Sequence, residues 1–71
     1  MVSYKPLFKL LVDREMSKAD LMRTAHISPN TMTKIRRNEE VSMTILNKIC
    51  AALGVSYGDI MEYIHVHAHE E

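Results

Sequence analysis

Residues 26–38, with the sequence HISPNTMTKIRRN, contain many side chains able to hydrogen bond, and from Ser28 onward only two large apolar ones. The apolar residues are Met32 and Ile35, and their spacing would place both on one side of a helix. A helix that only covered a core would be expected to bury a wider apolar stripe. At about 100° per residue, the opposite side of this helix carries an amide, a hydroxyl, an ammonium and a guanidinium group, on Asn30, Thr33, Lys34 and Arg37.

These polar groups are suited to the edges of DNA bases. An asparagine amide can pair with adenine, a lysine or arginine can pair with guanine, and a threonine methyl can contact the methyl of thymine. The backbone N–H groups and the positive dipole end at the start of the helix also suit a phosphate. Polar residues on a helix can equally form an ordinary solvated face. The DNA interpretation therefore depends on whether neighbouring elements leave this face protruding.

The residues before this segment predict a helix over about 18–25. Ser17 followed by Asp20 resembles a capping box, in which two residues at the start of a helix bond each other's backbone N–H groups. Leu21 and Ala25 then lie one turn apart on one face. This helix therefore has a defined start and one apolar side.

A second helix, over about 29–37, is predicted after a very short connection. Ser28 is a typical N-cap residue, and Pro29 is favoured at the first helical position. Two helices joined by so few residues are expected to cross steeply, with Ile27 filling the corner between them. Such a crossing would leave the polar face of the second helix protruding.

The remaining apolar spacing predicts three further helices. One runs over about 5–14, and another runs over about 43–53 and ends at Gly54. The last begins at a second capping box, Ser56 with Asp59. Its inward side is expected to be Ile60, Met61 and Ile64.

The five helices predict one compact all-α domain over residues 1–71. Its helical core would span about 4–64 and its tail 65–71. Both ends of the chain also hold residues of strand-like composition, namely Val2, Tyr4, Ile64 and Val66. We expect some of these to pair as short strands, either within the chain or across a dimer.

The charged residues are divided unevenly, although the formal net charge is zero. Residues 1–38 hold eight basic and three acidic side chains, a net of +5, whereas residues 39–71 hold one basic and six acidic ones, a net of −5. Such asymmetry favours a face that binds a polyanion. The role of Arg36 stays open between neutralising a nearby glutamate, contacting a phosphate and contributing to specificity. Solubilising charges are the simplest interpretation for Lys5, Lys9 and Arg14.

The sequence lacks the patterns that would indicate an enzyme or a cofactor. It has no glycine-rich phosphate loop and no carboxylate pair at a defined spacing, and its only cysteine, Cys50, lies in an apolar stripe typical of a core. No apolar run approaches the ~20 residues of a membrane span. We therefore expect a cytoplasmic protein without enzymatic activity, cofactor or membrane partner.

Three histidines alternate near the end of the chain, at His65, His67 and His69. In an extended chain they would share one face and could bind Zn²⁺ or Ni²⁺. Adjacent side chains on a strand point outward, however, and no second cluster completes a site. An edge strand or a terminal tail without metal is the simpler interpretation.

The spacing of apolar residues and caps over 18–37 resembles the helix-turn-helix of the phage-repressor/Cro family. The segments YKPLFKLLVDREMSKADL and NKICAALGVSYGDIMEYI are similar to a group of very small bacterial members, in which KIC-x-x-L and GDI-x-E recur. This resemblance covers about residues 4–64. It implies a five-helix DNA-binding domain of a transcriptional regulator, usually acting on a two-fold symmetric operator.

The resemblance also implies which residues contact DNA. The positions that read bases in the family correspond to Pro29, Asn30, Thr33 and Lys34. The positions that bind phosphates correspond to Ser17, Lys18, Arg37 and Asn38.

The sequence departs from the family pattern at three positions. His26 stands where the turn usually has glycine, at an expected cost of roughly 1 kcal/mol for a positive φ. Met22 stands where alanine is usual, which is expected to separate the two helices slightly. Pro29 has no N–H to donate, so base recognition should depend more on Asn30 and Lys34.

Together these observations predict a sequence-specific DNA-binding regulator that acts on double-stranded DNA as a homodimer. Two alternatives remain at this point. One is a protein-interaction module that uses the same helix surface, and the other is a metal-responsive repressor that uses the histidine-rich tail.

Overall fold

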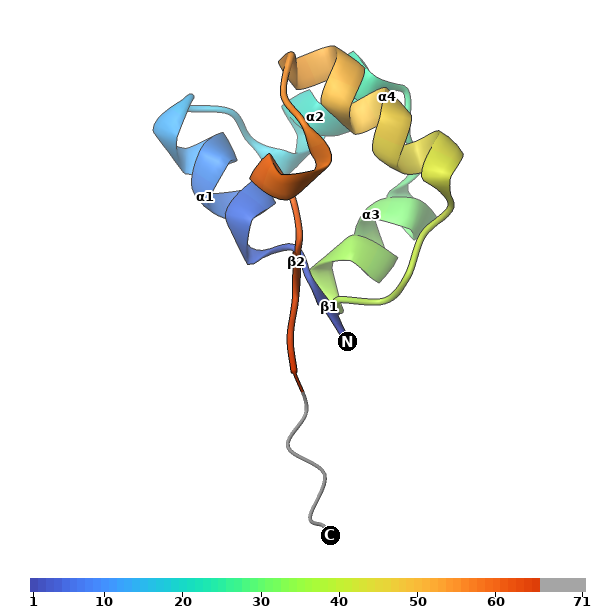
Figure 1. The fold of residues 1–71 in the computed structure, drawn as a ribbon. Coiled ribbons are helices and arrows are strands. Elements are labelled where there is room, and N and C mark those ends of the chain that lie inside the picture. Colours follow the sequence, from blue (N-terminus) through green and yellow to red (C-terminus); the bar gives the residue numbers. More distant parts are fainter. Residues whose placement is uncertain (66–71) are drawn as a thin grey trace, which may run out of the picture.

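The computed structural model of the chain describes residues 1–65 (Figure 1). In chain order its elements are β1 (Val2–Ser3), α1 (Lys5–Asp13), α2 (Lys18–Ala25), α3 (Pro29–Arg36), α4 (Met43–Leu53), the 3-10 helix η1 (Tyr57–Asp59) and β2 (Glu62–Tyr63). The ranges predicted for the first four helices agree with the structure to within one residue at each end. The mostly helical architecture confirms the all-α class.

The helix starts are fixed by serine caps. The hydroxyl oxygens of Ser17, Ser28 and Ser42 each accept a hydrogen bond from the backbone N–H three residues further on, at 3.0–3.3 Å. This satisfies a donor that has no partner within the helix. At the other end of α4, Gly54 adopts a φ of 66°, a left-handed conformation that glycine reaches without steric cost.

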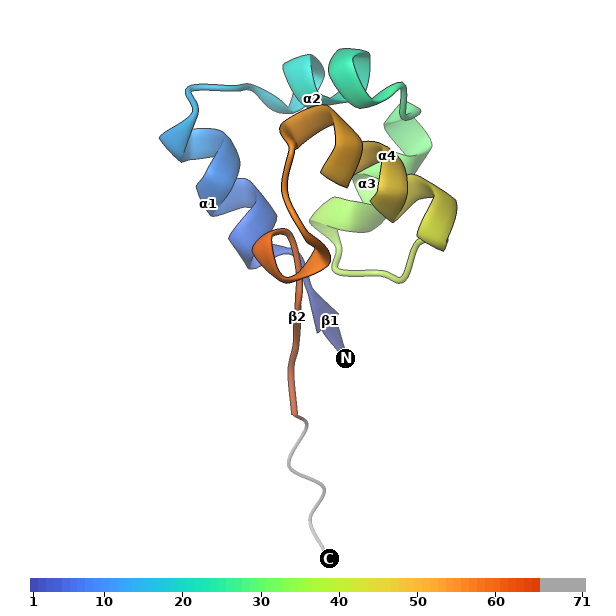
Figure 2. The ribbon, with the colours of Figure 1, turned by 45° about the horizontal axis from the view of Figure 1, so that its top comes forward.

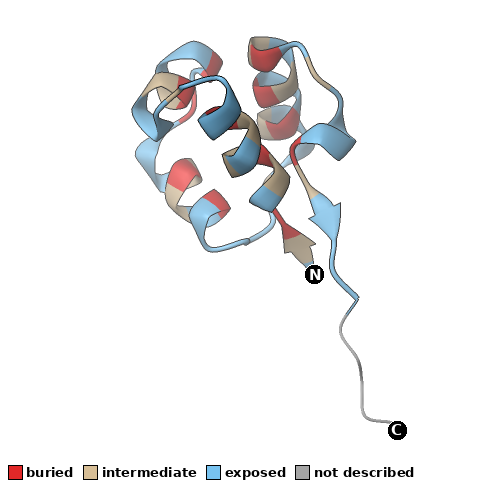
Figure 3. Cartoon of the chain, turned by 90° about the vertical axis from the view of Figure 1, so that its left-hand side faces the viewer, coloured by how far each residue is buried: buried red, intermediate tan, exposed pale blue. Residues whose placement is uncertain are grey.

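The apolar core lies between the helices, where their buried faces turn toward one another (Figure 3). α2 packs against both α3 and α4, and α1 packs against η1. Cys50 is partly buried at the edge of this core, and desolvation, helped by the charge of Asp59, raises the pKa of its thiol. The buried apolar residues are Tyr4, Leu7, Leu11, Leu21, Ala25, Ile27, Met32, Ile35, Leu46, Ile49, Leu53 and Ile60.

The prediction of a fifth α-helix is wrong. Only the three residues of η1 are helical after α4, and the chain then continues as a strand. Ile60 is fully buried, as predicted, but Ile64 is exposed. The physical reason is a competing partner for the backbone, because the N–H of Ile64 donates to the carbonyl oxygen of Met1 at 2.7 Å instead of to a preceding turn.

The two ends of the described chain form a small antiparallel sheet. Val2 pairs with Tyr63 and Ser3 with Glu62. Both views of the ribbon place β1 and β2 side by side, away from α2 (Figures 1 and 2). This confirms the expected strand pairing at the termini and places it within one chain.

Two basic side chains cap the C-terminal ends of helices. Arg14 donates to the carbonyl oxygen of Leu53 at 2.6 Å, and Lys48 donates to that of His26 at 3.3 Å. Cations near a helix C-terminus are stabilised by the carbonyl groups that lack partners there. Arg14 therefore has a structural contact as well as the solubilising role expected from the sequence.

Tyr4 ties the start of the chain to the segment that follows α3. Its side chain is 1% exposed, and its phenol donates to the carbonyl oxygen of Glu39 at 2.8 Å. Its backbone N–H donates to Oδ1 of Asn38 at 3.0 Å. Burial raises the pKa of Tyr4, with a smaller contribution from the charge of Glu40, and a backbone hydrogen bond with Val41 opposes this shift.

Replacing the phenol of Tyr4 should destabilise the fold in a pH-dependent way. At neutral pH we expect Tyr4→Phe to lower the free energy of unfolding by about 1 kcal/mol, because Glu39 loses its donor. The raised pKa means that stability from Tyr4 is complete below the pKa of the unfolded chain, near 10, and declines at higher pH as the unfolded phenol ionises first. The difference in the free energy of unfolding between the parent and Tyr4→Phe should therefore become smaller above about pH 10.

Urea unfolding at neutral and alkaline pH measures both effects. Tyr63→Phe is the matched control, since the Tyr63 side chain is 69% exposed, and it should leave the unfolding free energy unchanged. Equal stability of Tyr4→Phe and the parent at neutral pH would contradict the structural role given to this hydrogen bond.

Candidate nucleic-acid interface

The connection between α2 and α3 is a tight turn built on His26 and Ile27. His26 adopts φ 57° and ψ 50°, and its N–H donates to the carbonyl oxygen of Met22. The N–H of Ile27 donates to the same oxygen at 3.1 Å, while its side chain is only 7% exposed. The predicted positive φ at His26 and the predicted burial of Ile27 are therefore both confirmed. Figure 2 shows the two helices leaving this turn in different directions.

This turn leaves one side of α3 in solvent. Met32 and Ile35 are buried, whereas Pro29, Asn30 and Lys34 are exposed. Thr33 is partly buried, and its hydroxyl donates to the carbonyl oxygen of Pro29 at 3.0 Å. The hydroxyl hydrogen of Thr33 is thus used inside the helix. The amide of Asn30 and the ammonium of Lys34 remain at the surface, as the sequence predicts.

The four residues expected to bind phosphates are also exposed, but their side chains make different contacts within the chain. Lys18 places its ammonium 5.3 Å from the ring centre of Phe8. Arg37 lies 3.9 Å from the carboxylate of Glu39, an exposed pair of the kind that contributes little energy. Asn38 takes a φ of 59° and bonds the chain near β1 through its amide oxygen. Arg37 is the C-cap residue of α3, and Asn38 follows it directly.

The start of α2 is already occupied by a carboxylate of the chain itself. Asp20 accepts from the backbone N–H of Ser17 at 2.9 Å, while the Ser17 hydroxyl oxygen accepts from the N–H of Asp20. Arg23 forms an ion pair with Asp20. The backbone and hydroxyl of Ser17, and then Arg23, lower the pKa of the Asp20 carboxyl, so it is ionised at neutral pH. A phosphate near α2 therefore needs positive side chains in addition to the helix start.

Outside this region, the described residues offer little support for metal binding. His67 and His69 lie outside the described residues, while His65 is exposed, with its ring 4.7 Å from that of Tyr63 in an edge-to-face arrangement. Over residues 1–65, no group of three histidine, cysteine or acidic side chains is arranged to hold a metal ion. In the same range, no helix has the length and apolar character needed to cross a membrane.

Comparison with known proteins decides the family. A model of the Cro/C1-type helix-turn-helix DNA-binding domain matches residues 7–65. The chain belongs to this family. It is also similar to a crystal structure of the transcriptional regulator VanUg (form II), with 46% sequence identity and a TM-score of 0.83, covering 86% of this chain and 81% of that one. No match was found among curated proteins.

The family and the structural neighbour together support a DNA-binding regulator. Helix-turn-helix regulators are typically not enzymes, in agreement with the lack of a catalytic pattern in the sequence. In this Cro/C1-type domain, α2 and α3 form the helix-turn-helix, and the resemblance seen in the sequence is confirmed.

The sequence left the role of one basic residue open, and the structure of the Cro/C1-type domain places this residue in a groove beside α2. Arg36 is exposed at the end of α3 and lines a surface groove with Lys18. Arg36 lies two helical turns after Pro29, and this spacing of seven could have indicated the shared flank. Ion pairing with Glu39 involves Arg37 instead.

The left-handed backbone at His26 predicts a stabilising substitution. His26→Gly should raise the free energy of unfolding by about 1 kcal/mol, because glycine reaches a positive φ without the steric cost paid by other residues. The His26 side chain is exposed, so little packing is lost. Urea unfolding measures the gain.

His26→Ala is the matched control for the His26→Gly substitution. It also removes the imidazole but keeps a Cβ at the positive φ, so it should give no gain. If the free energy of unfolding of His26→Gly were no higher than that of His26→Ala, this would contradict a strained conformation at His26.

Proposed function

We propose that this Cro/C1-type domain regulates transcription by binding a specific DNA sequence, with α3 in the major groove. The observation that carries the proposal is that the Asn30 and Lys34 side chains are exposed on α3, while Met32 and Ile35 hold its other side in the core. An amide and an ammonium on one helix face can distinguish adenine and guanine edges. Pro29 and the methyl group of Thr33 would add apolar contact with the bases.

The phosphate contacts in this proposal surround the base-contacting residues on both sides. Ser17 and Lys18 stand at the start of α2, and Arg37 and Asn38 follow α3. Backbone contacts of this kind fix the position and orientation of the protein on the duplex but carry no direct sequence information. Their number sets how steeply binding weakens as salt rises.

The domain is proposed to bind DNA as a homodimer, since one helix of eight residues contacts only a few base pairs. Support for a second copy comes from the outer edge of β2. Because Met1 and Ile64 exchange hydrogen bonds, the alternation of an antiparallel ladder turns the N–H and C=O of Tyr63 away from β1. Two such edges related by a two-fold axis are complementary to each other.

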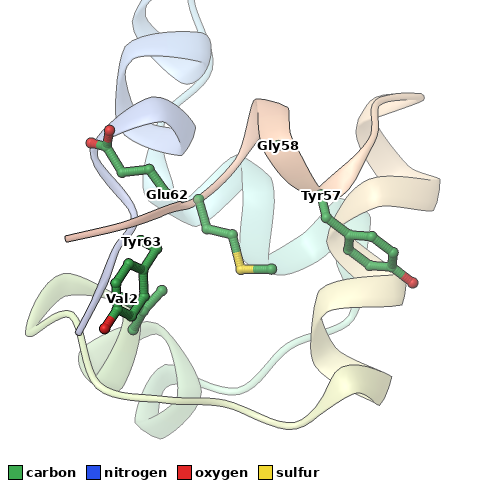
Figure 4. A pocket seen from close by; sticks show the side chains of 6 residues that line it. Val2, Tyr57, Gly58, Glu62 and Tyr63 are labelled. Atoms are coloured by element: carbon green, nitrogen blue, oxygen red, sulfur yellow. The ribbon is translucent and has the colours of Figure 1, made fainter. Parts of the chain in front are cut away.

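Exposed apolar side chains surround this edge. An open pocket of about 320 Å³ is lined by Val2, Tyr57, Gly58, Met61, Glu62 and Tyr63. Figure 4 shows Val2 and Tyr63 on one side of the pocket and Tyr57 on the other. Exposed apolar patches of this kind are typical of interaction surfaces.

Two substitutions separate sequence recognition from general DNA affinity. Lys34→Ala should relax the preference at one base-pair position, at a cost of about 1–3 kcal/mol for the preferred base. Arg37→Ala should weaken binding to all sequences about equally and reduce the salt dependence by about one phosphate contact. Titrations with the preferred duplex and its single-base variants measure both effects.

Lys5→Ala is the matched control, because Lys5 is an exposed lysine on α1. It should change neither the base preference nor the affinity. If Lys34→Ala and Arg37→Ala both bind as the parent does, the α3 surface does not contact DNA. Binding to a protein partner would then be the better explanation for this face.

Selection from random oligonucleotides with the purified protein identifies the operator and tests the dimer. The expected result is an inverted repeat whose half-sites lie about 10 base pairs apart. Tyr63→Pro removes the N–H on the outer edge of β2 while leaving the β1–β2 bonds intact, so it should lower the dimer fraction in sedimentation experiments. Tyr63→Phe keeps this N–H and should behave as the parent. A single half-site and a parent that is monomeric on DNA would contradict the homodimer.

A further inference from the structure

A surface groove separates the start of α2 from the flank of α3. It has a volume of about 220 Å³, and its lining residues are Lys18, Met22, Pro29, Met32, Thr33 and Arg36. Its two charged residues are both basic, and they come from different helices. The other lining residues are apolar apart from Thr33, whose hydroxyl hydrogen is bonded to the Pro29 carbonyl.

The two cations of the groove are not neutralised by the acidic residues around them. Within residues 1–65, the ion pairs are those of Arg23 with Asp20 and Arg37 with Glu39, and neither involves Lys18 or Arg36. Lys18 instead contacts the ring of Phe8, a weak contact at an exposed site that an anion could replace. A cleft with one sign of charge and apolar walls concentrates the electric field, so this groove attracts anions.

Some of the backbone donors nearby are used inside the chain. Asp20 accepts from the N–H of Ser17 at the start of α2. At the start of α3, Pro29 has no N–H, and the N–H of Thr31 donates to the Ser28 hydroxyl oxygen at 3.1 Å. These donors are not available to a phosphate at the junction of α2 and α3, so basic side chains would contribute to its binding in addition to the remaining N–H groups.

We infer that Lys18 and Arg36 hold one phosphate of the DNA backbone between them, across the groove between α2 and α3. This inference rests on the proposed function, and it adds Arg36 to the residues that contact DNA. The groove adjoins Pro29 and Thr33, so the phosphate would lie beside the bases contacted by α3. The guanidinium of Arg36 can donate two parallel hydrogen bonds to phosphate oxygens, and Lys18 supplies a second charge.

The experiment measures how binding depends on salt for the full chain, using a mixed-sequence duplex of about 20 base pairs and the duplex obtained by selection. Each phosphate contact contributes about 0.9 to the slope of the logarithm of affinity against the logarithm of salt concentration. We expect Arg36→Ala and Lys18→Ala each to reduce this slope by about one contact on both duplexes. The preferred sequence should not change, because a phosphate carries no sequence information.

The double variant decides whether the two residues share a phosphate. Because both side chains bind the same phosphate, removing both should reduce the slope by about one contact. The affinity of the double variant should be no more than about twofold below that of the single variant that binds DNA more weakly. Arg36→Lys keeps the charge and should retain the parent slope. Lys9→Ala, an exposed lysine on α1 outside this groove, is the matched control and should also retain it.

An Arg36→Ala variant that folds as the parent does and keeps its salt slope would overturn the inference. A double variant whose salt slope falls by about two contacts would also overturn the inference, because each residue would then bind a phosphate of its own. In both cases the proposed function would stand if Lys34→Ala still relaxed the base preference. A parent protein whose binding to both duplexes is weak and independent of salt would overturn the proposed function as well.

Discussion

The burial of Ile27 at the turn after α2 is the contact on which the candidate DNA-binding surface depends. The turn is short because His26 takes a left-handed conformation and because the N–H groups of His26 and Ile27 bond the same carbonyl of Met22. With Ile27 held in the core, α3 cannot fold back along α2. The apolar side of α3 then turns inward and its polar side remains in solvent. The end of α2 is held from the other side by Lys48, which bonds the carbonyl of His26.

A second set of contacts joins the N-terminal residues, and β2 through them, to the segment after α3. Tyr4 is buried and bonds both Asn38 and Glu39, so the residues just after α3 are fixed by the N-terminus. β1, which directly precedes Tyr4 in the chain, pairs with β2. In a chain of 71 residues the core is small, and long-range hydrogen bonds of this kind limit the motion of a connection that would otherwise be free. Arg37, a proposed phosphate contact, lies at the start of the segment that Tyr4 holds.

The zero net charge conceals a local arrangement that suits an anion. Acidic residues near the proposed surface are engaged within the chain, since Asp20 caps α2 and pairs with Arg23, and Glu39 lies near Arg37. Lys18, Lys34 and Arg36 take part in none of the ion pairs formed within residues 1–65. The charge that would steer DNA is therefore concentrated beside α2 and α3, and the total charge of the chain gives little information about it.

The sequence by itself determined the four α-helices, the caps at Ser17 and Ser28, and the outward face of α3. These features depend on local spacing, in which a cap or an apolar residue is followed by its partner three or four positions later. Tertiary structure decided the conformation of the segment after η1, because the backbone of Ile64 forms a hydrogen bond with Met1, which is distant in sequence. It also decided that Asn38 bonds Tyr4 and that Arg36 faces the same groove as Lys18. Local periodicity places a residue on one side of its own helix, but only the packing of one helix against another sets which residues of a different element lie opposite it.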